Sequence, residues 1–348
     1  MCCTVSTPAT RAAPAVGWAW PCSSAVCATR RSAEVDPFLD VDLPLPDRRD
    51  GKVRVSFALP DDAGGPRRLF VTTDRLSAFD RIIAGVPYKG QVLNQLAAWW
   101  FRQTADIVPN HVLSLPDPNA LIARAATPLT VEVVVRGYIT GVTSTSLWKQ
   151  YADGARVIYG HRFPDGMRKN TALPYALVTP TTKGTGGVHD VPLTVAEVAE
   201  QGLVPHKRWG EVVEAALLLF RRGQEVAAQA GLILADTKYE FGAAPDGSLL
   251  LIDEVHTPDS SRYWVADSYE ARLAAGEEPE SLDKEVVRRA LLDAGYSGDG
   301  EPPVLPAEVW EAASRRYIDA FQRLTGENFE PGTYPVTPRL KEALRDVV

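Results

Sequence analysis

Alternating hydrophobic and polar residues predict an antiparallel sheet in the first part of the chain. Residues 51–57 and 68–74 each alternate apolar with polar side chains, and a Gly-Gly-Pro turn begins at Gly64 between them. A period of two is typical of a half-buried strand. Residues 130–136 instead carry a β-branched run, which predicts a buried strand.

Apolar residues at helical spacing predict helices further along the chain, at residues 92–103, 211–230, 283–294 and 306–325. Trp99, Trp100 and Phe101, in the first of them, are expected in the core or at an interface. The last two helices are expected to serve as scaffold without chemistry of their own. Residues 173–190 read as a loop, and we expect a lid or a ligand loop there, with a flexible connection as the alternative.

A β-hairpin is predicted around Asp246 and Gly247. Strand-like runs lie on both sides of this pair within residues 236–253, and Asp-Gly is favoured in tight hairpin turns. A two-residue loop at this point sets Glu240 directly opposite Asp253. Two carboxylates are therefore expected to face each other across the hairpin.

Opposed carboxylates on a hairpin predict a cation site. Directly opposite side chains have Cβ atoms about 5 Å apart, where like charges destabilise the pair unless a cation lies between them. Lys238 shares the strand face of Glu240, so Glu240 and Asp253 suit a Mg²⁺ ion that is also bound by phosphate oxygens. Tyr239 and Phe241 then point into the core. The alternative is an exposed hairpin with solvated Lys238 and Glu240.

Cationic residues elsewhere in the chain predict anion binding. Residues 258–262, Pro-Asp-Ser-Ser-Arg, offer hydroxyls and a guanidinium that can fork onto phosphate or carboxylate. Arg136 ends the buried strand before a loop punctuated by glycine, a position that commonly faces a cleft. Lys52 and Arg54 share one strand face, and either meet nucleotide phosphates or are simply solvated.

Composition narrows the classes of function. The 348 residues are 45% hydrophobic and 23% charged, which is ordinary for a globular protein, and the formal net charge is −7. Such a chain has no general basic field for nucleic acid. No apolar run reaches transmembrane length, no His-Glu-x-x-His motif occurs, and no complete P-loop motif surrounds Lys89-Gly90. Nucleic-acid or membrane partners, a zinc hydrolase and a P-loop NTPase are therefore not expected.

The first 33 residues have the composition of an organellar transit peptide. They contain three arginines, no acidic residue and many Ala, Ser and Thr. A secretory signal is the rival interpretation, although Pro14 and Pro21 interrupt its apolar stretch, and a disordered extension without an address is the third. All four cysteines lie within the first 27 residues, so the folded body is expected to have no disulfide of its own and no thiolate nucleophile.

Several motifs resemble, in order and spacing, the phosphoribosylaminoimidazole-succinocarboxamide synthase (SAICAR synthetase) family of purine biosynthesis. They are Ser-Ala-Phe-Asp at 77–80, Lys89-Gly90, residues 135–141, residues 179–183 with His189-Asp190, residues 236–242 and residues 253–264. The match covers roughly residues 44–330. Residues 147–170 look most like the plant-type, plastid-targeted branch, so we expect the plastid stroma, with the cytoplasm as the alternative.

The resemblance implies an α+β fold related to ATP-grasp enzymes and kinases, with an antiparallel β-rich lobe over a larger α+β lobe and ATP between them. The domains expected on this template are an extension at 1–40, a nucleotide lobe at 41–129, a catalytic lobe at 130–272 and a helical segment at 273–348. The implied reaction is ATP- and Mg²⁺-dependent ligation of L-aspartate to the carboxylate of carboxyaminoimidazole ribotide, through an acyl phosphate. The sequence sets no oligomeric state.

The resemblance also implies roles for particular residues. Glu240 and Asp253 are expected to hold Mg²⁺, with Lys52, Arg54 and Lys238 near the nucleotide phosphates, and Arg136 and Arg262 are expected to bind the ribotide phosphate. The residues expected around the ribotide and aspartate are Asp80, Lys89, Lys183, His189, Asp190, Ser260 and Ser261.

Three departures from the family pattern are present. Val142 follows Gly141 where the family commonly has a phosphate-binding serine, which Thr143 or Ser144 could replace. Residues 55–57 are Val-Ser-Phe, and the loop after Lys183 is glycine-rich where an acidic stretch is usual. The rival functions are another ATP-dependent ligase or small-molecule kinase, and a nucleotide-binding protein without turnover.

Overall fold

The structure is a computed structural model that describes residues 35–347, apart from 80, 185–189 and 299. Two compact units divide the chain, Met1–Val35 and Asp36–Val348, and the second contains every element described below. The predicted transit peptide lies outside the described residues. The predicted division of residues 41–348 into three domains stays a prediction.

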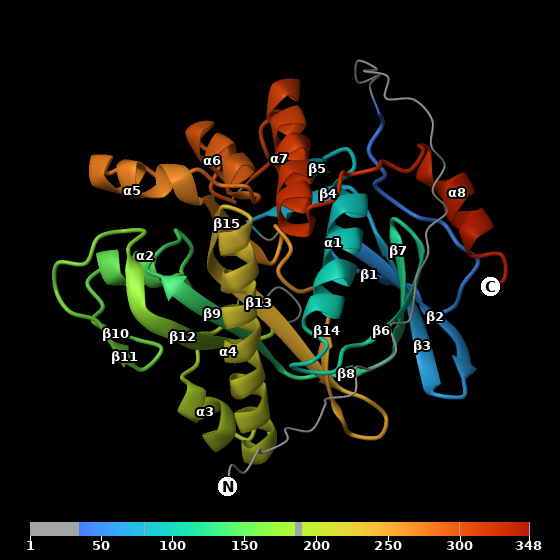
Figure 1. The fold of residues 1–348 in the computed structure, drawn as a ribbon, viewed down its shortest axis with the longest axis horizontal. Helices are drawn as coiled ribbons and strands as arrows, with labels where there is room; N and C mark the ends of the chain where they lie inside the picture. The colour runs from blue at the N-terminus through green and yellow to red at the C-terminus, as the bar shows by residue number, and fades with distance from the viewer. Residues whose placement is uncertain (1–34, 80, 185–189, 299, 348) are drawn as a thin grey trace, which may run out of the picture. The chain divides into compact units, whose positions relative to one another are not determined.

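An antiparallel sheet forms the N-terminal part of the described chain, as predicted. Its strands, in spatial order, are β1 (Arg49–Asp50), β2 (Arg54–Asp62), β3 (Gly65–Thr72), β7 (Ala120–Arg124) and β6 (Val112–Asp117). Alternate residues such as Val55, Phe57 and Leu69 are buried in a core shared with Phe38 and with Leu340 of helix α8 (Val336–Ala343). The C-terminal helix therefore packs on the N-terminal sheet (Figure 1).

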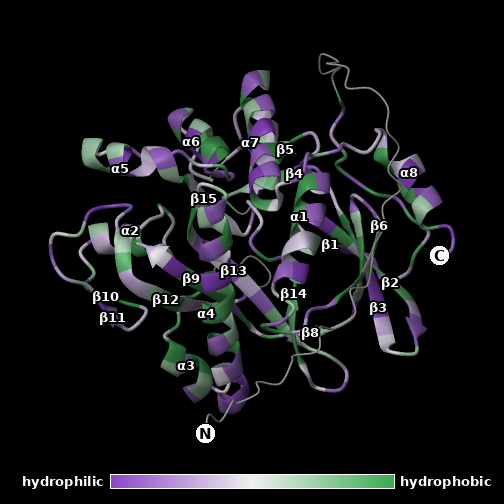
Figure 2. Cartoon of the chain, in the orientation of Figure 1, coloured by the Kyte–Doolittle hydropathy of each residue, from purple (hydrophilic) through white to green (hydrophobic). Residues whose placement is uncertain are grey.

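A second sheet is built around the long strand β13 (Leu232–Ala243). The path β12 (Ala172–Thr182), β9 (Val131–Tyr138), β13 and β14 (Leu249–Ile252) is extended by β15 (Ser261–Val265) and β8 (Thr127–Pro128), which also pair with β13. Helix α4 (His206–Gln229) packs against this sheet (Figure 1). Its sequence mixes apolar and polar residues along its length, as Figure 2 shows, and the apolar ones form the buried side. Helix α4 thereby covers one face of the sheet with apolar side chains.

Further helices surround the sheets. They are α1 (Lys89–Gln103), α2 (Leu147–Ala152), α3 (Val195–Glu200), α5 (Ala266–Ala275), α6 (Glu285–Asp293) and α7 (Ala307–Thr325). The smaller strands are β4 (Arg75–Ala78), β5 (Arg81–Gly85), β10 (Val157–Ile158) and β11 (His161–Arg162). Helix α1 lies against α7, and Trp100 and Phe101 are buried in the main core. The four predicted helices are confirmed, with ends shifted by a few residues. No helix of the described part of the chain is long and apolar enough to cross a membrane.

The predicted loop at 173–190 is wrong for most of its length. Residues up to Thr182 form strand β12, which pairs with β9 from Leu177↔Arg136 to Thr182↔Val131. The run Thr-Pro-Thr-Thr-Lys at 179–183 and the glycines after it favoured a loop. However, β12 is an edge strand of its sheet, where the missing N–H donor of Pro180 is tolerated.

The predicted register of the hairpin is also wrong, by one residue. Ala243 pairs with Leu249 and Glu240 pairs with Ile252, so Asp253 is not directly opposite Glu240. Gly247 N–H donates to the Ala244 carbonyl, which leaves three residues in the loop where two were predicted. The loop is longer because Asp246 accepts hydrogen bonds from the backbone and side chain of Ser248, an Asx turn that extends the connection.

Candidate active site

A cleft of about 550 Å³ opens beside both sheets. Strand β2 and the chain before it, the end of β4, strand β13, the loop after β14 and helix α6 all contribute side chains to it. The charged residues among them are Arg49, Asp50, Lys52, Arg54, Lys238, Glu240, Asp253, Glu254, Asp259, Lys284 and Arg288. Carboxylates and cations thus line the same cavity.

Strand β13 places its polar side chains in this cleft by its period of two. Tyr239 and Phe241 are fully buried in the core, as predicted, while Lys238 and Glu240 lie on the opposite face of the strand. Each oxygen of Glu240 accepts from a lysine, Oε1 from Lys238 and Oε2 from Lys183, both at 2.6 Å. Lys238 also donates to Glu132 at 3.0 Å. The result is a compact cluster of two carboxylates and two ammonium groups.

Asp253 reaches the cleft although the hairpin register is displaced. Its backbone is left-handed, with φ 69°, directly after β14 ends at Ile252. A side chain on such a residue leaves the alternation of the strand, and Asp253 consequently lines the same cavity as Glu240. Arg54 holds it with a 2.7 Å ion pair and also donates to its carbonyl. The two predicted metal ligands are brought together, by a kink instead of by cross-strand opposition.

The two carboxylates have opposite protonation behaviour. Burial alone would raise the pKa of Glu240, but Lys238 and Lys183 hold it well below its usual range. Burial raises the pKa of Asp253 to about 6, and the negative charge of Glu240 adds to this rise against the opposing effect of Arg54. Asp253 is therefore a half-buried carboxylate whose charge is only partly compensated by Arg54, which is the condition that a bound cation relieves.

The donor set fits a magnesium ion that shares its ligands with a nucleotide. Among the residues that the structure describes, no group of three or more His, Cys, Asp or Glu side chains is arranged to hold a metal ion. Magnesium commonly takes one or two carboxylates together with water and substrate phosphates. Glu240 and Asp253 meet that pattern, and Glu254 lines the cleft beside them.

Two arginines share the carboxylate of Asp236, which precedes Glu240 by four residues on strand β13. In the ladders of β13, Asp236 pairs with Arg136 on one side and with Arg262 on the other, so the three side chains lie in a row. Arg262 donates to Asp236 Oδ2, and Arg136 lies 3.5 Å from the same oxygen. Arg136 also donates to Thr179 and to the Thr145 carbonyl. This Arg136–Asp236–Arg262 row carries one net positive charge.

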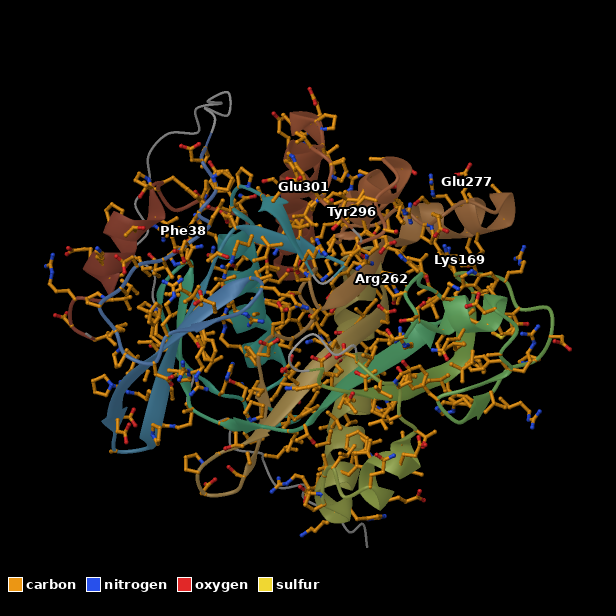
Figure 3. The ribbon with its side chains drawn as sticks, turned by 180° about the vertical axis from the view of Figure 1, so that it is seen from behind. Phe38, Lys169, Arg262, Glu277, Tyr296 and Glu301 are labelled. Carbon is orange, nitrogen blue, oxygen red and sulfur yellow. The ribbon has the colours of Figure 1, made fainter. Side chains whose placement is uncertain are left out.

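A small hollow continues from this row towards helix α5. Gly141, Val142, Lys169, Arg262 and Arg289 line it. Figure 3 shows Arg262 near the middle of the molecule and Lys169 on the segment that approaches α5. Val142, which occupies the position of the family's serine, is 37% exposed and offers no side-chain hydrogen bond. Glu278 and Glu285 line the same hollow, so its three cations exceed its carboxylates by one charge.

The other predicted substrate residues lie in varied surroundings. Lys89 is fully buried, and its Nζ pairs with Asp259 at 2.7 Å. Ser261 shares a hydrogen bond with Thr237, and Ser260 lies within hydrogen-bond distance of Thr257. Lys52 lines the cleft, and Lys183 donates to Glu240. Asp190 accepts a hydrogen bond from the Gly184 amide. Asp80 and His189 lie outside the described residues. Their roles stay predictions.

Several charged residues of the site were not predicted from the sequence. They are Glu132, Asp236, Glu254, Asp259, Lys284 and Arg288. The two-residue period of a strand could have predicted two of them. Glu132 lies on the same strand face as Arg136, and Asp236 lies on the same strand face as Lys238. Lys284 and Arg288 correct the expectation that residues 283–294 are scaffold only, because α6 and the residue before it line the cleft. Nothing in the helix itself marked its approach to strands far away in sequence.

A cavity lined by paired carboxylates and cations, on an α+β frame, defines an enzyme that acts on anionic substrates. The family model for SAICAR synthetase matches residues 47–303. A relative from Legionella pneumophila (strain Lens), phosphoribosylaminoimidazole-succinocarboxamide synthase, is 47% identical over 86% of this chain and 95% of its own. The chloroplastic synthase of Vigna aconitifolia is 54% identical over 74% of this chain and 72% of its own.

Solved structures agree with these relatives. The SAICAR-synthase of Saccharomyces cerevisiae, complexed with SAICAR, is 31% identical, with a TM-score of 0.72 over 84% of this chain and 100% of that one. A type-2 SAICAR synthetase in complex with ADP, at 23% identity and a TM-score of 0.61, shares the fold. The chain belongs to the SAICAR synthetase family. The predicted α+β fold and the predicted function, that of a ligase of purine biosynthesis, are confirmed.

Proposed function

We propose that this chain joins the amine of L-aspartate to the carboxylate of carboxyaminoimidazole ribotide at the expense of ATP, releasing SAICAR, ADP and phosphate. The observation that carries the proposal is the sharing of one strand, β13, by the Glu240 cluster and by the Arg136–Asp236–Arg262 row. The ligands of the relatives, SAICAR in the yeast structure and ADP in the type-2 structure, support the same pairing of sites.

The nucleotide is proposed to bind over strand β2 and the hairpin. Glu240 and Asp253 would hold Mg²⁺, and Lys52, Arg54 and Lys238 would contact the phosphates, since all of them line the cleft. When bound, the metal neutralises negative charge on the phosphate chain during transfer. Lys238 keeps its proton, because Glu240 and Glu132 raise its pKa against the effect of burial. It can thus supply a fixed positive charge next to a moving phosphoryl group.

The ribotide is proposed to bind with its phosphate at Arg136 and Arg262. Two guanidiniums on one carboxylate leave N–H donors free for an anion, and forked donors suit phosphate geometry. Its carboxylate would then point along β13 towards the nucleotide. Phosphorylation of that carboxylate gives an acyl phosphate with a good leaving group. The amine of aspartate attacks the acyl carbon and phosphate departs, a step that depends mainly on orientation.

Further residues are proposed to border the nucleotide, ribotide and aspartate sites. Lys183 already binds Glu240, and Asp190 lies on the same connection. Asp80, Lys89, His189, Ser260 and Ser261 are kept as ribotide or aspartate neighbours. The plastid stroma is the proposed location, with the cytoplasm as the alternative, because plant relatives such as that of Vigna aconitifolia are named chloroplastic.

The decisive experiment measures ADP release by the purified protein with ATP, Mg²⁺, ribotide and aspartate, each omitted in turn. The proposal expects ADP only when all four are present, together with the mass of SAICAR in the product. Turnover that needs the ribotide but not aspartate would indicate a small-molecule kinase. Nucleotide binding without any turnover would indicate a protein that has lost the reaction.

A further inference from the structure

Asp253 reaches the cleft because its backbone departs from the strand before it. Glu240 pairs with Ile252, and directly opposed residues of an antiparallel pair share one face. A strand continued to Asp253 would place its carboxylate on the opposite face, where Tyr239 and Phe241 are buried in the core. The left-handed backbone of Asp253, with φ 69°, directs the side chain into the cleft that Glu240 lines. The position of this carboxylate therefore depends on an unusual conformation being held.

One arginine holds Asp253 in this conformation. Arg54 Nη1 donates to the Asp253 carbonyl at 2.7 Å, and Arg54 Nη2 lies 2.7 Å from Oδ1 of the same residue. The first contact fixes the peptide group after the kink, and the second fixes the side chain. A left-handed backbone costs free energy for a residue that carries a side chain, so it persists only where the surroundings hold it. The forked guanidinium binds both acceptors at once, which the single ammonium group of a lysine does not do in the same geometry.

Arg54 is itself fixed, and it belongs to the other sheet. It pairs with Thr72 at the start of β2, and the carbonyl of the preceding Val53 accepts from both the N–H and the hydroxyl of Thr73. Arg54 and Asp253 are 199 residues apart in the sequence, and both side chains are partly buried. Their contact therefore joins the N-terminal sheet, over which the nucleotide is proposed to bind, to a proposed ligand of the metal.

The same arrangement occurs a second time in the N-terminal sheet. Arg68 donates to Oδ2 of Asp47 at 2.6 Å and to the Asp47 carbonyl at 2.9 Å, and Asp47 also has a left-handed backbone, with φ 50°. Neither residue belongs to the described lining of the cleft. An arginine that binds both the carbonyl and the carboxylate of a left-handed aspartate thus stabilises the backbone in this chain without any phosphate nearby.

We propose that Arg54 is a positioning residue that acts through Asp253, by holding its carboxylate in the cleft with Glu240 for Mg²⁺. This inference rests on the proposed function, because it deepens the metal site of that reaction. The phosphate contact proposed above for Arg54 would add to this role and can be separated from it. A donor to phosphate strengthens nucleotide binding with or without the metal. A residue that positions Asp253 strengthens only the part of the binding that Mg²⁺ adds.

The test measures the dissociation constant of ADP by calorimetry, once with Mg²⁺ and once with EDTA, for the unaltered protein, Arg54→Gln and Arg54→Lys. A charge-assisted contact is worth about tenfold to a hundredfold in affinity. Arg54→Gln should weaken ADP binding in Mg²⁺ by that factor more than it does in EDTA. Arg54→Lys keeps the charge without the fork, so it should lie nearer to Arg54→Gln than to the unaltered protein. Equal losses in the two titrations would overturn the inference.

Arg68→Gln is the matched control, because it removes the same pair of contacts from a left-handed aspartate outside the cleft. The ratio of its two dissociation constants should stay within about threefold of the ratio in the unaltered protein. Any change at Ser56, to which Arg68 also donates, would affect both titrations alike.

A double variant tests whether Arg54 acts through Asp253. Asp253→Asn alone should remove most of the affinity that Mg²⁺ adds, and Arg54→Gln on that background should then weaken both titrations equally. Additive losses in Mg²⁺ would overturn the inference and leave the ligase function intact. If the unaltered protein binds ADP equally with Mg²⁺ and with EDTA, the metal site and the inference fail together. Mg²⁺-dependent ADP binding without aspartate-dependent ADP release would refute the ligase function alone.

Discussion

Two neighbouring positions on one face of strand β13 carry opposite surpluses of charge. At Asp236, a single carboxylate lies between two guanidiniums. At Glu240, the lysines are outnumbered once Glu132, Asp253 and Glu254 are included, even with Arg54 beside them. An excess of donors suits a phosphate, and an excess of carboxylates suits a divalent cation. A few residues of one strand thus separate an anion site from a cation site.

The largest expected effect comes from removing the charge of Glu240. Glu240→Gln should lower kcat on the order of 10²–10³-fold, because the amide is a poor metal ligand and two lysines lose their carboxylate. Steady-state ADP release measures it. Glu225→Gln, with a side chain 56% exposed on α4, is the control. A kcat within tenfold of the unaltered protein would show that the cluster does not act on the phosphoryl group.

Removing a guanidinium beside Asp236 should affect the binding of the ribotide only. Arg262→Gln is expected to raise the KM for ribotide by about tenfold to a hundredfold, because a charge-assisted contact to phosphate is lost. The KM for ATP should stay within about threefold. Arg323→Gln, which loses only a pair with Asp319 on α7, serves as control. Equal increases for ribotide and ATP would contradict the separation of the two sites.

The buried His256, between strands β14 and β15, should make the stability of the fold depend on pH. His256 contacts Tyr239 through its ring and accepts from Tyr263 through its carbonyl, and burial lowers its pKa to about 3. The folded protein holds it neutral, so this stability is present above about pH 6.5 and is lost as pH falls, by about 1.4 kcal/mol per pH unit.

Urea unfolding between pH 7 and pH 5 tests this expectation with His256→Gln. The variant should lose this share of the slope, while the buried His111, whose pKa burial lowers to about 3 as well, keeps its own share. Identical slopes in the two proteins would show that His256 is not held neutral.

The smallest expected effect comes from adding a hydrogen-bonding side chain to the hollow beside Arg262. Val142→Ser should lower the KM for ribotide by about twofold to tenfold, which corresponds to one added hydrogen bond in the hollow beside Arg262. Val157→Ser, at another exposed valine, is the control. No change would mean that the hollow does not receive the phosphate.

The sequence predicted the local part of this site. Lys238 and Glu240 on one face, with Tyr239 and Phe241 in the core, follow from the two-residue period of a strand, and the structure agrees. The hairpin was predicted, but its predicted register was wrong by one residue, because an Asx turn at Asp246 lengthened the loop. Asp253 still reaches the cleft through its left-handed backbone, a feature that no periodicity reveals.

Alternation along the chain by itself determined which residues of β13 are polar and which face they share, since that depends only on backbone geometry. The motifs determined the family. Tertiary structure alone decided that Arg136 and Arg262 flank Asp236, that Glu132 joins Lys238, and that Lys284 faces the nucleotide residues. These contacts depend on strand register and on how a distant helix packs. Both are set by interactions between segments far apart in the sequence.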